Sequence, residues 1–282
     1  MKYQEILSIA PEPGAFAYDE QFTMLYALSI GAGAAAGDLP FVYEQQLRAL
    51  PSMAVLMAAG AGDFITDGGI DFARIVHGEQ RLTIHKPLPA SGRMTSQARC
   101  LGVTDKGKDK GALLTIESTI SDAENGECYA ISTMTMFCRG DGGFGGPQTG
   151  ALPLHPMPER QHDLELSLPT LPQQAALYRL MGDRNPLHID PEAAQAAGFE
   201  RPILHGLCTY GIAGRAIVQA CCGNDPAMIE RLDARFSSPV YPGEPVTTRI
   251  WRDGRQISFE CLVPERNVTV IRNGMCLLRE PS

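Results

Sequence analysis

In the second half of the chain, the pattern of apolar positions predicts one buried helix followed by strands. Residues 202–222 are apolar or small almost all round, which is typical of a helix buried on every side. The segments that follow are short and apolar or alternating, and Asp253-Gly254 is a favoured hairpin turn between two of them. The pattern therefore predicts strands at residues 232–236, 246–252, 256–263 and 268–278.

The first half shows the same kinds of element. Segment Lys86–Cys100 aligns with Ser238–Arg252, and the two share a proline followed by an apolar residue in register. We interpret the chain as a duplicated α+β unit in which an antiparallel sheet wraps a helix. Since each unit alone would leave a sheet edge open, we expect the two sheets to join into one. The first half is predicted to hold helices at 24–30 and 43–57, and strands at 79–84, 93–103, 112–120 and 128–137.

A shift in composition separates the two halves. Residues 139–172 are dense in Gly and Pro and have no hydrophobic period, which is typical of a linker or a long crossover. The sequence therefore predicts an N-terminal repeat at 1–138, a linker at 139–172 and a C-terminal repeat at 173–282.

Composition excludes several classes of protein. With 44% hydrophobic and 20% charged residues in 282, the chain is not a disordered or low-complexity scaffold. The net charge of -8 argues against a nucleic-acid partner or an anionic membrane surface, which would need a basic face. The longest apolar stretch, residues 53–62, is too short to span a bilayer, so we expect no membrane association.

The ends and the cysteines favour a cytoplasmic location. The N-terminus has no sustained apolar core of the kind a signal peptide needs, and the C-terminal letters REPS are not a peroxisomal tripeptide. The eight cysteines contain no CxxC pair, so we interpret them as small core residues in a reducing compartment.

The segment GDRNPLHIDP, residues 182–191, carries the clearest candidate chemistry. Pro186 forces a turn, and Asp190-Pro191 is a favoured helix start, so Asp183 and His188 lie on one rigid loop with Asn185 between them. A carboxylate, an imidazole and an amide can together hold a water molecule and move its protons. The alternative is that these are turn, cap and structural residues only, because Asx residues dominate turns for local reasons.

His205-Gly206 is the second candidate element. These residues lie near the start of the long apolar helix, where backbone N–H groups are unpaired and the helix dipole favours negative charge. Glycine lets a substrate approach the backbone, so the Gly206 N–H could serve a developing oxyanion such as a thioester enolate. The alternative is a helix-start glycine in a crowded core.

These residues resemble a known family. YRLMGDRNPLHIDPEAAQAAGF followed by RPILHGLCTYG is similar to the signature of the MaoC-like, R-specific enoyl-CoA hydratase family (hydratase 2), above all to the hydratase domain of multifunctional enzyme type 2. In the first half YALSIGAG, FVYEQ, VHGEQ, KPLP and GGFGG extend the likeness to roughly residues 20–280. The resemblance implies a double hotdog fold, which agrees with the duplication.

The resemblance also implies roles for individual residues. It implies Asp183 and His188 as the catalytic pair, Asn185 as a group that positions water, and the Gly206 N–H as the oxyanion hole. It implies a non-catalytic first repeat whose helix region has opened for a bulky acyl chain. Other polar positions match the family, and for these we expect hydrogen-bonding, capping or pocket-lining roles: Tyr26, Glu44, His77, Tyr178, Arg179, Asp190 and His205.

Three other sequence patterns are considered as binding sites for a dinucleotide, a metal or coenzyme A phosphates. Gly31–Gly37, GAGAAAG, resembles a dinucleotide-binding loop, but no βαβ unit surrounds it. Histidine spacing does not argue for a metal, since His188 and His205 are too far apart in sequence to predict a zinc site. Asp105–Gly111, DKGKDKG, is typical of a solvated hairpin loop, and the sequence does not distinguish this from lysine contacts with coenzyme A phosphates.

The resemblance implies an enzyme that reversibly hydrates trans-2-enoyl-CoA to (3R)-3-hydroxyacyl-CoA. The alternative is a non-catalytic acyl-CoA-binding protein or a thioesterase on the same fold. No separate cofactor is expected, because coenzyme A is part of the substrate. A homodimer is expected by analogy with the family.

Overall fold

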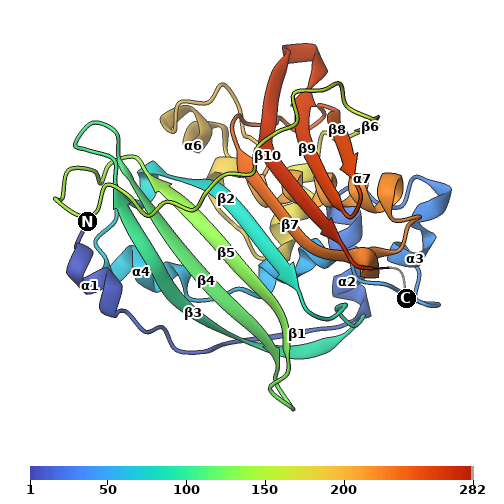
Figure 1. Cartoon of the computed structure of the whole chain (residues 1–282), viewed down its shortest axis with the longest axis horizontal. Coiled ribbons are helices and arrows are strands. Elements are labelled where there is room, and N and C mark those ends of the chain that lie inside the picture. Colours follow the sequence, from blue (N-terminus) through green and yellow to red (C-terminus); the bar gives the residue numbers. More distant parts are fainter. Residues whose placement is uncertain (281–282) are drawn as a thin grey trace.

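The computed structural model describes residues 1–280 and contains an antiparallel sheet of ten strands (Figure 1). The strand order is β1-β3-β4-β5-β2-β7-β10-β9-β8-β6. In the first half the strands are β1 (Gly14–Tyr18), β2 (Ile75–Ile84), β3 (Gly92–Asp105), β4 (Ala112–Asp122) and β5 (Cys128–Cys138). In the second half they are β6 (Leu164–Leu168), β7 (Ile229–Phe236), β8 (Val246–Asp253), β9 (Gln256–Val263) and β10 (Val268–Leu278).

The duplication is visible in the strand order. From its outer edge inward, each half runs first, third, fourth, fifth and second strand, so the two halves have one topology. They join where β2 pairs with β7, with Glu79 opposite Arg235 and Thr83 opposite Arg231. The expected double hotdog with one continuous sheet is confirmed. The short edge strands β1 and β6 were not expected, and β6 lies inside the segment predicted as linker.

The long helix of the second half packs against the sheet. α7 (Gly206–Cys221) has eleven buried residues and contacts β6, β7 and β8, as its largely apolar sequence predicts. It begins at Gly206, later than the predicted 202, because the chain before it is extended and Leu204 N–H donates to Val240 O. The shorter helices before it are α5 (Gln174–Tyr178) and α6 (Pro191–Ala196).

The first half lacks a matching long helix in the described residues. The predicted helix over 43–57 is wrong: residues 43–50 are turns and coil, and Pro51–Met57 is a 3₁₀ helix. Gln46 has a positive φ of 61°, and Pro51 provides no N–H, so an α-helix cannot continue through either. Besides this segment the first half has α1 (Tyr3–Ser8), α2 (Glu20–Ser29), α3 (Leu39–Val42) and α4 (Ala61–Asp67).

Three further features are the segment that joins the two halves, the cysteines and the apolarity of the helices. Residues 139–163 cross the outer face of the sheet, where Arg81 donates to Pro153 O and Asn273 donates to His155 O (Figure 1). All eight cysteines are free thiols, and five are buried. Within residues 1–280 no helix is both long and apolar enough to cross a membrane.

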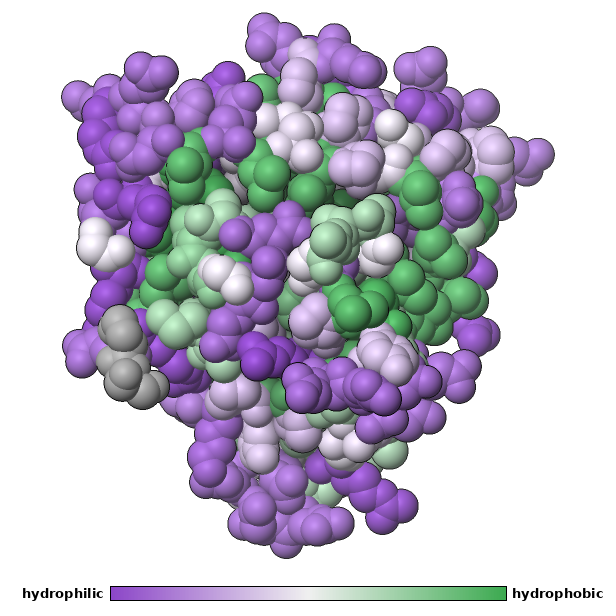
Figure 2. All heavy atoms as spheres, turned by 90° about the vertical axis from the view of Figure 1, so that its right-hand side faces the viewer, coloured by the Kyte–Doolittle hydropathy of each residue, from purple (hydrophilic) through white to green (hydrophobic). Residues whose placement is uncertain are grey.

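One side of the molecule exposes apolar surface. Leu28 on α2 and Leu39 on α3 are 43% and 58% exposed. Both helices lie on the right-hand side of Figure 1, which is the side that Figure 2 turns toward the viewer, and there hydrophobic surface gathers. Exposed apolar patches mark interaction surfaces. The dimer expected from the sequence remains a prediction.

Candidate active site

The candidate catalytic turn follows a short helix that stops at a glycine. α5 runs into a 3₁₀ turn, and Gly182 after it has φ 117°, a conformation that favours glycine. Asp183 comes next, and Pro186 begins the 3₁₀ turn that carries His188. Asp190 accepts a hydrogen bond from the Glu192 N–H and so caps α6, as predicted. Local sequence therefore holds Asp183 and His188 on one rigid loop.

Asp183 and Asn185 also stabilise this loop themselves. Asp183 Oδ1 accepts from the Asn185 N–H at 3.1 Å, and Asn185 Oδ1 accepts from the Leu187 N–H at 3.0 Å. These are the local turn roles common to Asx residues. In the described chain neither Asp183 Oδ2 nor the Asn185 amide nitrogen has a partner, so each residue keeps one polar group available.

His188 is buried with a defined tautomer. Its Nδ1 lies 2.9 Å from the carbonyl oxygen of Ile203, which only accepts, so Nδ1 carries the proton. Nε2 then has a free lone pair. Burial lowers the pKa of His188, against the opposing effects of the Ile203 carbonyl and the Asp183 charge. At neutral pH the side chain is therefore a neutral proton acceptor.

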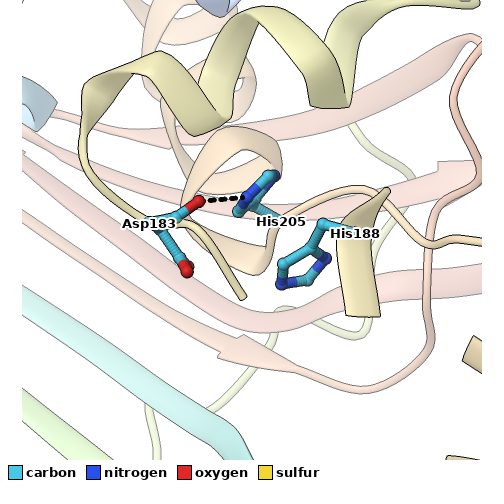
Figure 3. Close-up of side chains that lie close together, drawn as sticks. All are labelled: Asp183, His188 and His205. Atoms are coloured by element: carbon cyan, nitrogen blue, oxygen red, sulfur yellow. Dashed lines mark hydrogen bonds between the residues drawn. The ribbon is translucent and has the colours of Figure 1, made fainter. Parts of the chain in front are cut away.

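His205 joins the turn to the start of α7 (Figure 3). Its Nε2 donates to the backbone oxygen of Asp183 at 3.2 Å, and its ring stacks on that of His188 with centroids 3.8 Å apart. Burial and the neighbouring His188 lower the pKa of His205 to about 4. The structure thus brings together three residues of which only Asp183 and His188 were expected to meet.

This cluster has the donor types of a metal site. One ligand atom from each of Asp183, His188 and His205 lies within 4.8 Å of the others, a proximity that their sequence spacing did not predict. The two rings stack face to face with an inclination of 28°, so their in-plane lone pairs lie in two nearly parallel planes. Zinc requires converging ligands. The stacked rings are therefore an unfavourable arrangement for two zinc ligands.

Gly206 is the first residue of α7, so its N–H belongs to the group that the helix leaves unpaired. A Cβ at this position would meet nothing closer than 3.6 Å, where the Phe236 ring lies. Neither packing nor a positive φ therefore requires glycine here. The glycine leaves the space beside its N–H open.

Comparison with known proteins places this chain in a family. Residues 16–140 match the MFE-2 hydratase 2 N-terminal domain, and residues 154–274 match the MaoC like domain. The 3-hydroxyacyl-thioester dehydratase Y of Mycobacterium tuberculosis is 42% identical over 247 residues, which cover 86% of this chain and 84% of that protein. The chain belongs to the MaoC-like hydratase 2 family.

Other relatives agree with this hydratase 2 membership. The peroxisomal enoyl-CoA hydratase 2 of Arabidopsis thaliana is 36% identical, over 91% of this chain and 89% of its own. The structure of the Drosophila melanogaster peroxisomal multifunctional enzyme type 2 superimposes with a TM-score of 0.83 at 38% identity and covers 95% of this chain. This chain spans 48% of that longer enzyme. A mycobacterial double hotdog protein, 12% identical with a TM-score of 0.56, shows the fold alone. The chain is accordingly an enzyme of the hydratase type.

In this hydratase 2 member, three of the other predicted residues lie beside the cluster. The Tyr178 ring lies 4.9 Å from the His205 ring, and the Arg179 charge acts on His205. His77 on β2 packs edge-on against Phe236 at 5.0 Å, and its burial lowers its pKa to about 4. Phe236 links His77 to Gly206. The sequence reasoning missed it, because a single aromatic residue at the end of a strand carries no chemical signal.

Of the remaining predicted residues, Tyr26 packs behind Tyr178 with ring centroids 6.4 Å apart, and Glu44 lies in an exposed segment. Tyr26 is fully buried, and its hydroxyl donates to Ser52 Oγ at 2.9 Å, so it supports packing and is not exposed to a ligand. Glu44 is exposed on a turn and makes no hydrogen bond in residues 1–280. Gly31–Gly37 follows α2 and not a strand, so a dinucleotide loop is excluded there.

Proposed function

We propose that this chain reversibly hydrates trans-2-enoyl-CoA thioesters to (3R)-3-hydroxyacyl-CoA. The observation that carries the proposal is the free Nε2 lone pair of neutral His188 beside Asp183, next to the unpaired N–H of Gly206. Relatives named enoyl-CoA hydratase and hydroxyacyl-thioester dehydratase, 36–42% identical, support the substrate class.

The proposed chemistry divides among these groups. A water held by Asp183, His188 and the Asn185 amide adds its oxygen to C3 and gives up a proton. The substrate gains a proton at C2, so one water is added overall. Charge develops on the thioester oxygen meanwhile, and the Gly206 N–H at the positive end of α7 stabilises it. Dehydration follows the same path in reverse.

We further propose that the repeats have different roles. The second repeat carries Asp183, His188 and Gly206, while the first repeat holds acyl chain. A 3₁₀ helix at Pro51–Met57 and short α4 stand in the first repeat where the second has α7, which supports this division. The cytoplasmic location remains a prediction.

Loss of crotonyl-CoA absorbance with the purified protein tests the proposal. We expect Asp183→Asn and His188→Ala to lower turnover about 100-fold or more, the scale of general acid–base catalysis, with little change in Tm. Affinity for a saturated acyl-CoA should change little in His188→Ala. Near-normal turnover in His188→Ala would show that the acid–base pair is wrong.

Product analysis separates the remaining alternatives. The product should be the 3R alcohol, so a dehydrogenase strict for 3S alcohols should give no signal. A signal with that dehydrogenase would refute the stereochemical assignment. Release of free coenzyme A thiol would indicate a thioesterase, and binding without turnover would indicate a non-catalytic protein.

A further inference from the structure

His205 contacts Asp183 and His188 and directly precedes Gly206. We infer that His205 is a positioning residue, which fixes Asp183, His188 and the Gly206 N–H relative to one another without itself exchanging a proton. This inference rests on the proposed hydratase function and deepens it. In this inference the His205 side chain joins the loop that carries Asp183 and His188 to the start of α7.

The contacts that carry the inference come from three directions. The Nε2–H of His205 holds the backbone oxygen of Asp183 at 3.2 Å, and the His205 ring supports the His188 ring at 3.8 Å with a 28° tilt. Its own backbone immediately precedes Gly206, and its carbonyl oxygen accepts from the N–H groups of Cys208 and Thr209, each at 3.1 Å. A shift of this one residue therefore moves all three groups.

The side chain has little freedom to move. His205 is 1% exposed, and the Tyr178 ring packs at 4.9 Å. Placement to this accuracy matters, because displacing a reacting group by about 1 Å costs about 100-fold in rate. His205 is thus held firmly enough to act as a reference point for the site.

The hydrogen bond also determines the tautomer and charge of His205. A carbonyl accepts only from a protonated nitrogen, so Nε2 carries the proton and Nδ1 has a lone pair. Nδ1 is buried and finds no partner in the described structure. The charged or titratable groups that face the ring are His188, Arg179, Tyr178 and the Asp183 carboxylate. A proton on His205 would be repelled by Arg179 and by any charge on His188, so the neutral form persists.

Two substitutions separate the hydrogen bond from ring packing. His205→Gln supplies an amide N–H in place of Nε2–H, whereas His205→Phe keeps a flat ring and removes the donor. We expect kcat within about 10-fold of wild type for Gln and about 100-fold lower for Phe, with KM within about twofold in both. His155→Phe on the outer face of the sheet is the matched control, and we expect normal kcat for it.

A second readout does not depend on turnover. Nitrogen NMR of histidine-labelled protein should show His205 as the Nε2–H tautomer from pH 8 down to about 5, and His188 as the Nδ1–H tautomer at pH 8. Each signal is assigned by its loss in the matching variant. In His205→Phe the His188 signals should shift or broaden, since the stacked ring then lacks its anchor to Asp183.

The outcomes are distinct. Wild-type turnover near zero would refute the proposed function. The NMR tautomers of His205 and His188 would still test whether His205 positions the other groups. A His205→Phe kcat within twofold of wild type would overturn the inference. Equal kcat losses in Gln and Phe with matching falls in Tm would also overturn it, as would a His205 that titrates near pH 6.5.

Discussion

Gly206 and Gly211 occupy the same helix, yet packing requires glycine only at Gly211. At Gly211 a Cβ would lie 2.7 Å from Ile30 and 3.0 Å from the Tyr26 hydroxyl, so α2 and α7 approach too closely for any side chain. At Gly206 the nearest atom would be an ordinary 3.6 Å away. One glycine is needed for packing, whereas the other leaves the N–H open.

Alanine at each position should separate these reasons. We expect Gly206→Ala to keep the wild-type Tm but to lower turnover about 10- to 100-fold, because its methyl group blocks approach to the N–H. Gly211→Ala should lower stability by about 1–3 kcal/mol through overpacking, while turnover of the folded protein stays near normal. Thermal melts and initial rates on both variants check this. A Gly206→Ala protein with full turnover would favour the crowded-core alternative.

Residues of the site differ in how far sequence alone could place them. Asp183, Asn185 and His188 are close in sequence, and Pro186 forces the turn between them, so their proximity followed from local rules. The stacking of His205 on His188 did not, because it depends on how α7 packs against the loop. Glu44 shows the opposite case: the family resemblance suggested a site residue, the structure places it exposed on a bend with no helix around it, and its role stays a prediction.

At the scale of elements, one buried ion pair connects the first repeat to α7. Asp38 is fully buried and accepts from Arg215 at 2.9 Å, from Gln219 at 3.0 Å, and from the N–H groups of Gly33 and Ala35. These bonds hold the pKa of Asp38 below its usual value although burial opposes them. The GAGAAAG segment is therefore held against α7.

Removing the Asp38 charge should be costly. Asp38→Asn leaves the Arg215 guanidinium buried without a counter-charge, and we expect a loss of about 3–5 kcal/mol in the free energy of unfolding. Glu5→Gln, which breaks the exposed Lys2–Glu5 pair, is the matched control and should change stability by less than about 1 kcal/mol. Urea unfolding of both variants measures the difference. Equal effects would contradict a stabilising role for the buried pair.

The strands were easier to predict than the helices for a physical reason. Alternation and turn residues act locally, and the last three strands match the predicted ranges to within one residue. The edge strands β1 and β6 are only five residues each, too short to show a period. The prediction of a helix at 43–57 is wrong, because its apolar residues are buried by the surrounding fold and do not form one face of an α-helix.

At the scale of the whole molecule, two buried histidines and the partly buried His77 are neutral, which links stability to pH. Burial lowers the pKa values of His77 and His205 to about 4 and also lowers that of His188. In the unfolded chain each histidine titrates near 6.5. Between these values the unfolded state binds more protons, so stability falls as pH falls.

We therefore expect Tm to be flat above pH 6.5 from these groups and to decline from there toward about pH 4. His77→Gln should reduce the pH dependence of stability in this range, because unfolding then takes up about one proton fewer. Scanning calorimetry at several pH values gives the slope. An unchanged slope in His77→Gln would show that His77 does not contribute to it.

The β2–β7 junction resembles an interface between two separate molecules more than a boundary inside one. The pairing of Glu79–Thr83 with Arg231–Arg235 joins the halves, while the exposed residues 148–150 only connect them covalently. A protease nick at 148–150 should therefore leave two fragments that stay together and keep the site intact. Denatured and then mixed, these fragments should regain structure as a heterodimer whose yield rises with concentration. Because one chain carries both halves, they pair within a single folding event. A single cut between them should make their pairing depend on concentration, as the association of two molecules does.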